Sequence, residues 1–220
     1  MSKCLVTKEL IDAVEWCQNA PDSIIKPEKG GDGILTWSVK AIRDLKDKLA
    51  RKSYTMSEPA KQGIFFENFL YDAMEKHVLP YNSSEFFEKV YNACVGGETQ
   101  RKGKFNTVIG GEECCVYGKE DVFFPDRIID IKTTGKWVDE RKYTKTIQHH
   151  LYCTIEQVWD FSYIVIVWDK FPNIKQLKRI DLKLERDKSE MELHLRTIKA
   201  FQYLKDVKLW ELYRDSYCLY

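Results

Sequence analysis

The stretch from Gly118 to Thr134 constrains the fold of this chain more than any other. It contains Pro125-Asp126, a pair that favours a tight turn, between segments rich in aromatic and β-branched residues. The sequence therefore predicts a hairpin, with one strand over residues 121–124 and a second over 127–133.

An acid and an amine share one face of the second strand. Side chains alternate between the faces of a strand, so Asp130 and Lys132 lie on the same side as Ile128, which indicates a partly buried face. Asp121 lies across the hairpin from them. Buried charge is costly unless it is paired or bound to a metal. Two carboxylates beside a lysine suit a divalent-metal phosphodiesterase, in which the acids hold the cation and the lysine supports a water or the charge on phosphate.

The ordered set of these residues resembles the PD-(D/E)XK nuclease superfamily. Asp121 precedes Asp-Ile-Lys at 130–132, and Gln-His-His-Leu-Tyr follows at 148–152. The branch with RecB-type nuclease domains and phage lambda-type exonucleases likewise places Asp on one strand, Asp/Glu-x-Lys on the next and Gln-x-x-x-Tyr on a helix. The resemblance covers roughly residues 63–170. It implies an α/β (α+β) fold with a central mixed β-sheet flanked by helices, a restriction-endonuclease-like core.

The resemblance also implies a metal site. The carboxylates of Asp121 and Asp130 and the carbonyl of Ile131 would hold Mg²⁺ or Mn²⁺, and Glu67 would complete the shell or help place a second ion. RecB-type members more often carry histidine at the position of Glu67, so a glutamate favours the phage type. Glu67 could instead be an acid at the edge of a helix stripe that bonds a nearby backbone group or tyrosine. Asp126 is a fallback acid in the turn.

Two further residues would act beside the metal. Lys132 would position the attacking water or offset transition-state charge, and Gln148 would orient the lysine or the water. Gln148 and Tyr152 share one helix face, four positions apart. On a buried face such a pair could also be satisfied polar groups without a catalytic role.

Several side chains are candidate DNA contacts. Tyr152 would contact a phosphate or the DNA backbone. Lys136, Arg141 and Lys145 lie close to the Gln-x-x-x-Tyr segment, and cations at a helix start do not serve helix stability. Arg43 belongs to the basic face of a helix predicted over 38–53, a face that could equally be solvated.

Hydrophobic periodicity defines the remaining elements. Helices are predicted over residues 7–19, 38–53, 58–78, 85–94, 139–158 and 186–213. Further strands are predicted over residues 105–109, 113–117, 161–168 and 176–184. The strand over 161–168 is apolar enough to be buried on both faces. The last helix is expected to turn Met191, Leu195, Ile198, Phe201 and Leu204 inward. We expect a helical N-terminal segment (1–57) before the nuclease core (58–220), in one compact domain overall.

Composition and cysteine spacing limit the partners, cofactors and location that we expect for this chain. The formal net charge is +1, so nucleic-acid binding must come from local patches. The seven cysteines have no CxxC spacing, which indicates reduced thiols. Only Cys153 and Cys218 follow Tyr152, so we expect no iron–sulfur cluster of the kind some RecB-type relatives carry. No apolar run approaches the ~18 residues of a membrane span. The opening Met-Ser-Lys-Cys lacks a signal-peptide core, so we expect the cytoplasm of a bacterium or phage-infected cell.

The sequence thus predicts a metal-dependent deoxyribonuclease. A phage-type exonuclease that acts on DNA ends in recombination or repair is favoured. The alternatives are an endonuclease of a restriction or defence system, a non-catalytic DNA-binding scaffold of the same fold, and an ordinary α/β domain with a surface Asp130–Lys132 pair. Besides DNA, the expected partners are further copies of the chain or a recombination protein, and no membrane.

Overall fold

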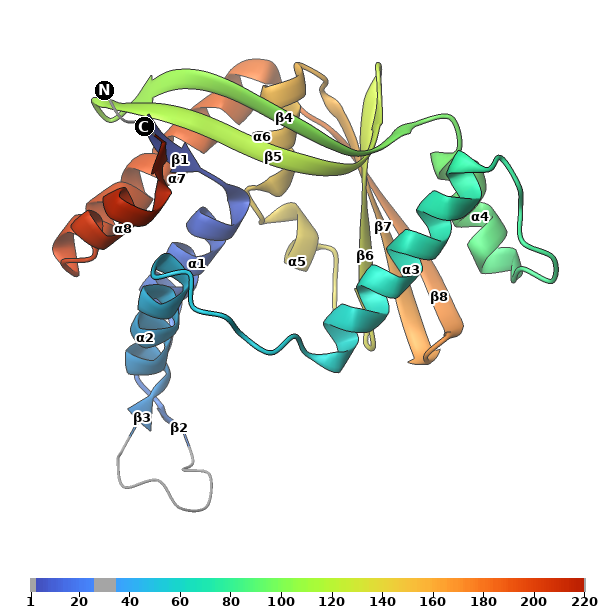
Figure 1. Ribbon diagram of the computed structural model, residues 1–220, viewed down its shortest axis with the longest axis horizontal. Helices are drawn as coiled ribbons and strands as arrows, with labels where there is room; N and C mark the ends of the chain where they lie inside the picture. Colours follow the sequence, from blue (N-terminus) through green and yellow to red (C-terminus); the bar gives the residue numbers. More distant parts are fainter. Residues whose placement is uncertain (1–2, 26–34, 220) are drawn as a thin grey trace. The chain divides into compact units, whose positions relative to one another are not determined.

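The computed structural model describes residues 3–25 and 35–219 (Figure 1). The chain forms two compact units. Unit 1 comprises Met1–Tyr54, Lys104–Tyr117 and Glu190–Tyr220, and unit 2 comprises Thr55–Gly103 and Gly118–Ser189. The fold class is confirmed as mixed α/β, with a central mixed β-sheet flanked by helices. The domain boundary at residue 57 stays a prediction. Among the described residues, no helix is both long and apolar enough to cross a membrane.

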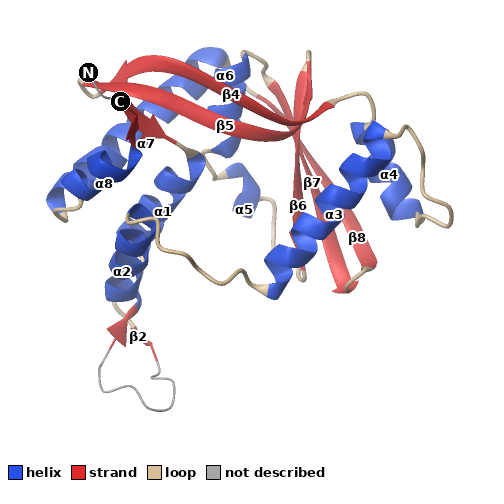
Figure 2. Ribbon diagram, viewed as in Figure 1, coloured by secondary structure: helices blue, strands red, loops and turns tan. Residues whose placement is uncertain are grey.

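Besides the start of β4 (Glu98–Ile109), unit 2 contains four strands or parts of strands. These are the second half of β5 (Glu112–Phe124), β6 (Arg127–Thr134), β7 (Asp160–Lys170) and β8 (Asn173–Lys183). The β5–β6 and β7–β8 pairs are antiparallel, and β6–β7 is parallel. The helices of unit 2 are α3 (Glu58–Glu75), α4 (Glu85–Cys94), α5 (Arg141–Thr144) and α6 (Gln148–Glu156), coloured as helices in Figure 2. The predicted hairpin at Pro125-Asp126 and the doubly buried strand over 161–168 are both confirmed.

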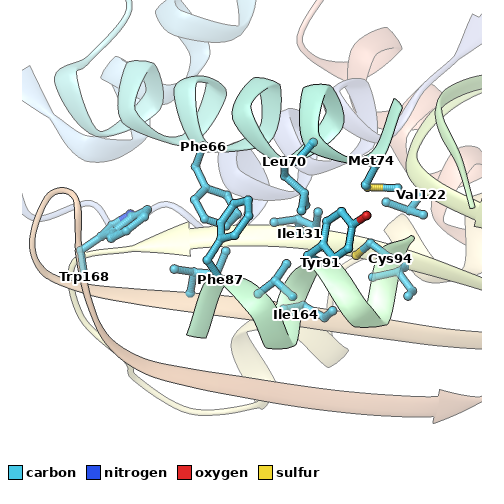
Figure 3. Close-up of a cluster of buried hydrophobic side chains, with 14 residues drawn as sticks. Phe66, Leu70, Met74, Phe87, Tyr91, Cys94, Val122, Ile131, Ile164 and Trp168 are labelled. Carbon is cyan, nitrogen blue, oxygen red and sulfur yellow. The ribbon is translucent and has the colours of Figure 1, made fainter. Parts of the chain in front are cut away.

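One face of this sheet packs against α3 and α4. Figure 3 shows side chains of these helices meeting those of β6 and β7, with Trp168 at one end of the cluster. Phe66, Leu70 and Met74 recur at helical spacing along α3 and are buried. Their burial fixes α3 on the sheet and so determines which face of α3 is left for polar residues.

Unit 1 holds the remaining elements. They are β1 (Lys3–Val6), α1 (Lys8–Asn19), β2 (Ile24–Ile25), β3 (Leu35–Thr36), α2 (Trp37–Leu49), α8 (Trp210–Tyr217), β9 (Cys218–Leu219), the first half of β5, and parts of β4 (Glu98–Ile109) and α7 (Arg186–Asp206). β1 pairs parallel with β5 at Cys114–Val116 and antiparallel with β9. Thr7 caps α1, because its side-chain oxygen accepts a hydrogen bond from the Leu10 N–H at 3.3 Å.

Two strands are longer than predicted. β4 begins at Glu98, before the strand predicted over 105–109, and β5 runs without a break through Gly118, joining the strands predicted over 113–117 and 121–124. A Cβ atom on Gly118 would lie 2.8 Å from the ring of Tyr152. This glycine therefore marks a close packing contact, and does not interrupt the strand.

Several helix predictions were wrong in extent. The helix expected over 139–158 is divided into α5 and α6, and the helix expected over 186–213 ends at Asp206, before α8. Lys208 has a positive φ of 58°, a left-handed conformation that a continuing helix cannot contain. The helix expected over 38–53 ends at Leu49.

The inward face predicted for the last helix was also partly wrong. Met191, Leu195 and Ile198 are exposed, whereas Phe201 and Leu204 are buried as expected. The buried face instead continues through Ser189, Leu193, Thr197 and Ala200. Small polar residues therefore occupy positions that an apolar pattern alone assigns to the surface.

Candidate active site

The hairpin between β5 and β6 brings two acids side by side. The strand register pairs Val122 with Ile129, so Asp121 and Asp130 follow on neighbouring strands. The backbone N–H of Ile131 donates a hydrogen bond of 2.8 Å to Oδ2 of Asp121. This bond fixes the Asp121 carboxylate against the strand that carries Asp130.

Asp130 is the most enclosed group of the site, with 1% of its surface exposed. Its Oδ1 accepts a hydrogen bond from Nε2 of Gln148 on α6. Its Oδ2 lies 2.5 Å from Nζ of Lys132 and has no other polar partner within the described residues. The predicted acid, lysine and glutamine are therefore in direct contact in the order Gln148, Asp130, Lys132.

Glu67 enters the site from α3 because a glycine lets this helix come close to β6. A Cβ on Gly63 would lie 2.7 Å from Oγ1 of Thr133. One turn later on the same face, Glu67 is half-buried and within electrostatic range of Lys132 and Asp130. Burial, and then the charge of Asp130, raise the pKa of Glu67 above its usual range, while Lys132 opposes the rise.

The three carboxylates hold the lysine in its charged form. Burial alone would lower the pKa of Lys132, but the attraction of the surrounding acids outweighs it, and the pKa is raised. Burial and the neighbouring charge of Asp130 raise the pKa of Asp121 well above its ordinary value. Asp121 and Glu67 thus bind protons more readily than isolated carboxylates do.

Sequence reasoning missed three residues near this cluster. Tyr71 follows Glu67 by one turn, and burial and the charge of Asp121 raise its pKa. Its hydroxyl accepts a hydrogen bond of 3.0 Å from Nε2 of Gln100. The charge of Lys119 opposes the rise in the pKa of Glu67. Lys119 precedes Asp121 by two positions in β5, so strand alternation could have placed both on one face.

The predicted DNA contacts come from several elements of the two units. Tyr152 is buried, with its ring against Gly118. Its side chain therefore has little exposed surface for the predicted phosphate contact. Lys136, Arg141 and Lys145 are exposed in and around α5, and Arg141 forms a 3.0 Å ion pair with Asp139. Arg43 is exposed on α2 in unit 1.

The donor set suits a hard divalent cation. Carboxylate oxygens from Asp121, Asp130 and Glu67 are the ligands that Mg²⁺ and Mn²⁺ prefer. Oδ2 of Asp130 is a buried oxygen whose polar contact is with Lys132. Within residues 3–25 and 35–219, however, no three His, Cys, Asp or Glu side chains are already gathered as a metal-binding group. The acids fit the chemistry of the ion, and metal binding stays a prediction.

Comparison with known proteins gives a likeness of fold. No family model and no curated protein matches the chain. A phage-related exonuclease from Haemophilus somnus 129PT superposes with a TM-score of 0.51 at 12% identity, over 90% of this chain and 93% of that one. An alkaline exonuclease, LHK-Exo, from Laribacter hongkongensis has a TM-score of 0.50 at 12% identity, over 96% of this chain and 92% of that one. LHK-Exo in complex with dAMP has a TM-score of 0.51 at 13% identity. At these identities the similarity concerns the fold.

Proposed function

We propose that this protein is a metal-dependent nuclease that hydrolyses DNA phosphodiester bonds, of the PD-(D/E)XK type and its RecB-type and lambda-type branch. The observation that carries the proposal is the contact of Gln148, Asp130 and Lys132, with Asp121 hydrogen-bonded alongside. An isolated surface ion pair would not require a buried aspartate that also accepts a hydrogen bond from a buried glutamine.

Each protein group has a role consistent with its position. Lys132, held as an ammonium group, places the attacking water or offsets negative charge that develops on the phosphate. Gln148 fixes the orientation of the Asp130 carboxylate. Burial, and then the charge of Asp130, raise the pKa of Glu67, and shifted acids of this kind are common at functional sites.

The residues that would hold Mg²⁺ or Mn²⁺ are Asp121, Asp130 and Glu67, with the Ile131 carbonyl. When bound, such an ion supplies Lewis-acid chemistry, since it acidifies water and offsets charge on the phosphate. The protein supplies the oxygen donors and a partly buried setting in which electrostatic effects are stronger than in water.

Among nucleases, we favour an exonuclease that acts on DNA ends in recombination or repair. The solved structures with a similar fold include a phage-related exonuclease and an alkaline exonuclease, which supports this mode. An endonuclease of a restriction or defence system is the alternative, because both modes use the same carboxylate and lysine chemistry. We place the activity in the cytoplasm, with DNA and further copies of the chain or a recombination protein as partners.

The test is cleavage of linear and closed circular duplex DNA with Mg²⁺, Mn²⁺ or EDTA. We expect linear DNA to be degraded and circles to survive in the presence of metal. Nicked or linearised circles would support the endonuclease. DNA binding without cleavage in any metal would instead point to a scaffold.

Two separate lysine substitutions test the assignment of the catalytic lysine. Lys132→Ala should lower the rate by about 10³-fold through the loss of transition-state charge stabilisation, with DNA binding retained. Lys183→Ala changes an exposed lysine of β8 and should leave the rate unchanged. Wild-type cleavage by the Lys132 variant would refute the assignment of the site.

A further inference from the structure

A second candidate site lies on unit 2, in an aromatic cavity of about 380 Å³. Its lining includes Phe65, Phe69, Tyr81, Phe87, Trp168 and Phe171. A volume of this size falls in the range of small-ligand sites, about 300–1,000 Å³. The mechanism proposed above uses none of these residues.

The rim of this cavity exposes unusually large aromatic side chains. Phe65 is 61% exposed and Tyr81 is 95% exposed. The ring of Phe171 meets that of Phe65 edge-to-face at 5.7 Å, and that of Trp168 at 5.1 Å. Apolar residues that are exposed singly on a surface are ordinary. Aromatic rings that are grouped around a cavity instead indicate a binding surface.

Trp168 is a largely buried aromatic residue of the cavity lining. Its indole Nε1 is buried and has no hydrogen-bond partner in the part of the chain that the structure describes. The residue itself is 6% exposed and lines the cavity. The cavity therefore suits an occupant with a flat apolar body that stacks on aromatic rings.

A nucleobase has such a body. Every base has a π-face that stacks on aromatic side chains, and every base edge carries a carbonyl oxygen or ring nitrogen that accepts a hydrogen bond. Exposed lysines flank the lining residues of the β7–β8 turn, Lys170 beside Phe171 and Lys175 beside Ile174. Aromatic rings interleaved with basic residues are typical of single-strand binding.

The cavity and the carboxylate cluster share helix α3. Phe65 and Phe69 line the cavity, whereas Gly63 and Glu67 face β6. Residues two positions apart are about 200° apart around a helix, so the two sites lie on opposite flanks of α3. A helix with its side chains is about 10–12 Å across, a distance that a short unpaired strand can span.

We infer that this cavity binds an unpaired nucleobase of the DNA on which the carboxylate cluster acts. The inference rests on the proposed nuclease function, and it adds a specific subsite for a single-stranded part of the substrate. The base stacks among the aromatic rings at the rim.

The test compares a short single-stranded oligothymidylate with an abasic strand of the same length, by fluorescence anisotropy in EDTA. Both strands carry the same phosphates, so their difference in affinity measures the contribution of the bases. We expect the wild type to bind the oligothymidylate about tenfold more tightly than the abasic strand. Phe65→Ala/Tyr81→Ala should remove most of this preference and leave abasic binding unchanged. Tyr54→Ala, which truncates an aromatic side chain that is 84% exposed, should retain the preference.

The indole N–H signal of Trp168 gives a second readout. In ¹⁵N-labelled protein, with the signal identified through Trp168→Phe, we expect it to shift with the oligothymidylate and to stay in place with the abasic strand.

The possible failures are distinguishable. If the wild type cleaves DNA, but the double variant keeps the full preference for bases, the subsite is refuted while the nuclease proposal stands. That outcome would leave a protein segment as the occupant of the cavity. If the wild type neither cleaves nor binds DNA under any condition, the proposed function fails, and the subsite fails with it.

Discussion

A Cβ atom on Gly63 would lie 2.7 Å from Oγ1 of Thr133, which is closer than unbonded atoms of this kind approach in proteins. α3 and β6 are therefore in contact at a point where only glycine fits. Glu67 lies one turn further along α3, so the geometry of the carboxylate cluster depends on this contact.

Gly63→Ala should lower the free energy of unfolding by about 1–3 kcal/mol, since the added methyl group forces α3 or Thr133 to move. The cleavage rate should also fall, because Glu67 moves with the helix. Chemical denaturation and cleavage assays measure the two effects.

Thr133→Ala supplies the control for this contact. The double variant Gly63→Ala/Thr133→Ala should recover the lost stability, and could gain about 1 kcal/mol from the higher helix propensity of alanine. If the two substitutions are additive, with no coupling energy, the contact does not determine the position of α3.

Gln148→Leu should destabilise the protein by about 1–3 kcal/mol, because Oδ1 of the buried Asp130 loses its hydrogen-bond donor. We expect the cleavage rate to fall in parallel. The matched control is Gln202→Leu, which removes a hydrogen bond of 2.7 Å to Asp206 in an exposed setting. The control should change stability by less than about 0.5 kcal/mol. Equal losses of stability in the two variants would mean that the buried Gln148–Asp130 hydrogen bond contributes no more to stability than an exposed one.

Mg²⁺ or Mn²⁺ should raise the melting temperature of the wild type, since an ion that binds only the folded state stabilises it by about 2.7 kcal/mol at one hundred times its Kd. Asp130→Asn should abolish the rise. Asp181→Asn, which alters an exposed acid of β8, should retain it. An equal rise in all three proteins would show that the ions bind elsewhere. Differential scanning calorimetry with and without EDTA provides this measurement independently of cleavage.

The buried thiols should resist alkylation in the folded protein. All seven cysteines are buried and free of disulfides. Burial, and then the charge of Asp121, raise the pKa of Cys94 to about 12, and burial raises the pKa of Cys17 to about 11. At pH 8 both groups are protonated in the folded state, and only the thiolate is nucleophilic. Iodoacetamide should therefore label these two residues slowly in buffer and completely in urea. Rapid labelling of Cys94 in buffer would contradict the burial described here.

Local patterns were sufficient to predict the hairpin. Pro125-Asp126 favours a turn, and the period of two in the following strand separates Asp130 and Lys132 from Ile129 and Ile131. Neither inference requires knowledge of distant residues. The contact of Gln148 with Asp130 spans eighteen positions, and it differs from the expected partner of Gln148, which was Lys132 or a water.

Elements that depend on tertiary contacts were harder to predict. The chain from 139 to 158 has helical spacing throughout, yet it is divided into α5 and α6, with Ile147 and Gln148 buried where α6 begins. In α7, both Leu195 and Leu193 could face inward by pattern alone, and packing selects Leu193. Tyr71 and Lys119 were missed because their significance comes from the acids beside them in space.

The parallel pairing of β6 with β7 affects when the site can form during synthesis of the chain. β6 carries Asp130 and Lys132, but the parallel strand beside it begins at Asp160, after α5 and α6. A nascent chain that ends before that point exposes β6 along one edge and has no neighbour to bury it. The carboxylate cluster can therefore assemble only after β7 has left the ribosome, and chains that stop earlier should be inactive and prone to aggregate.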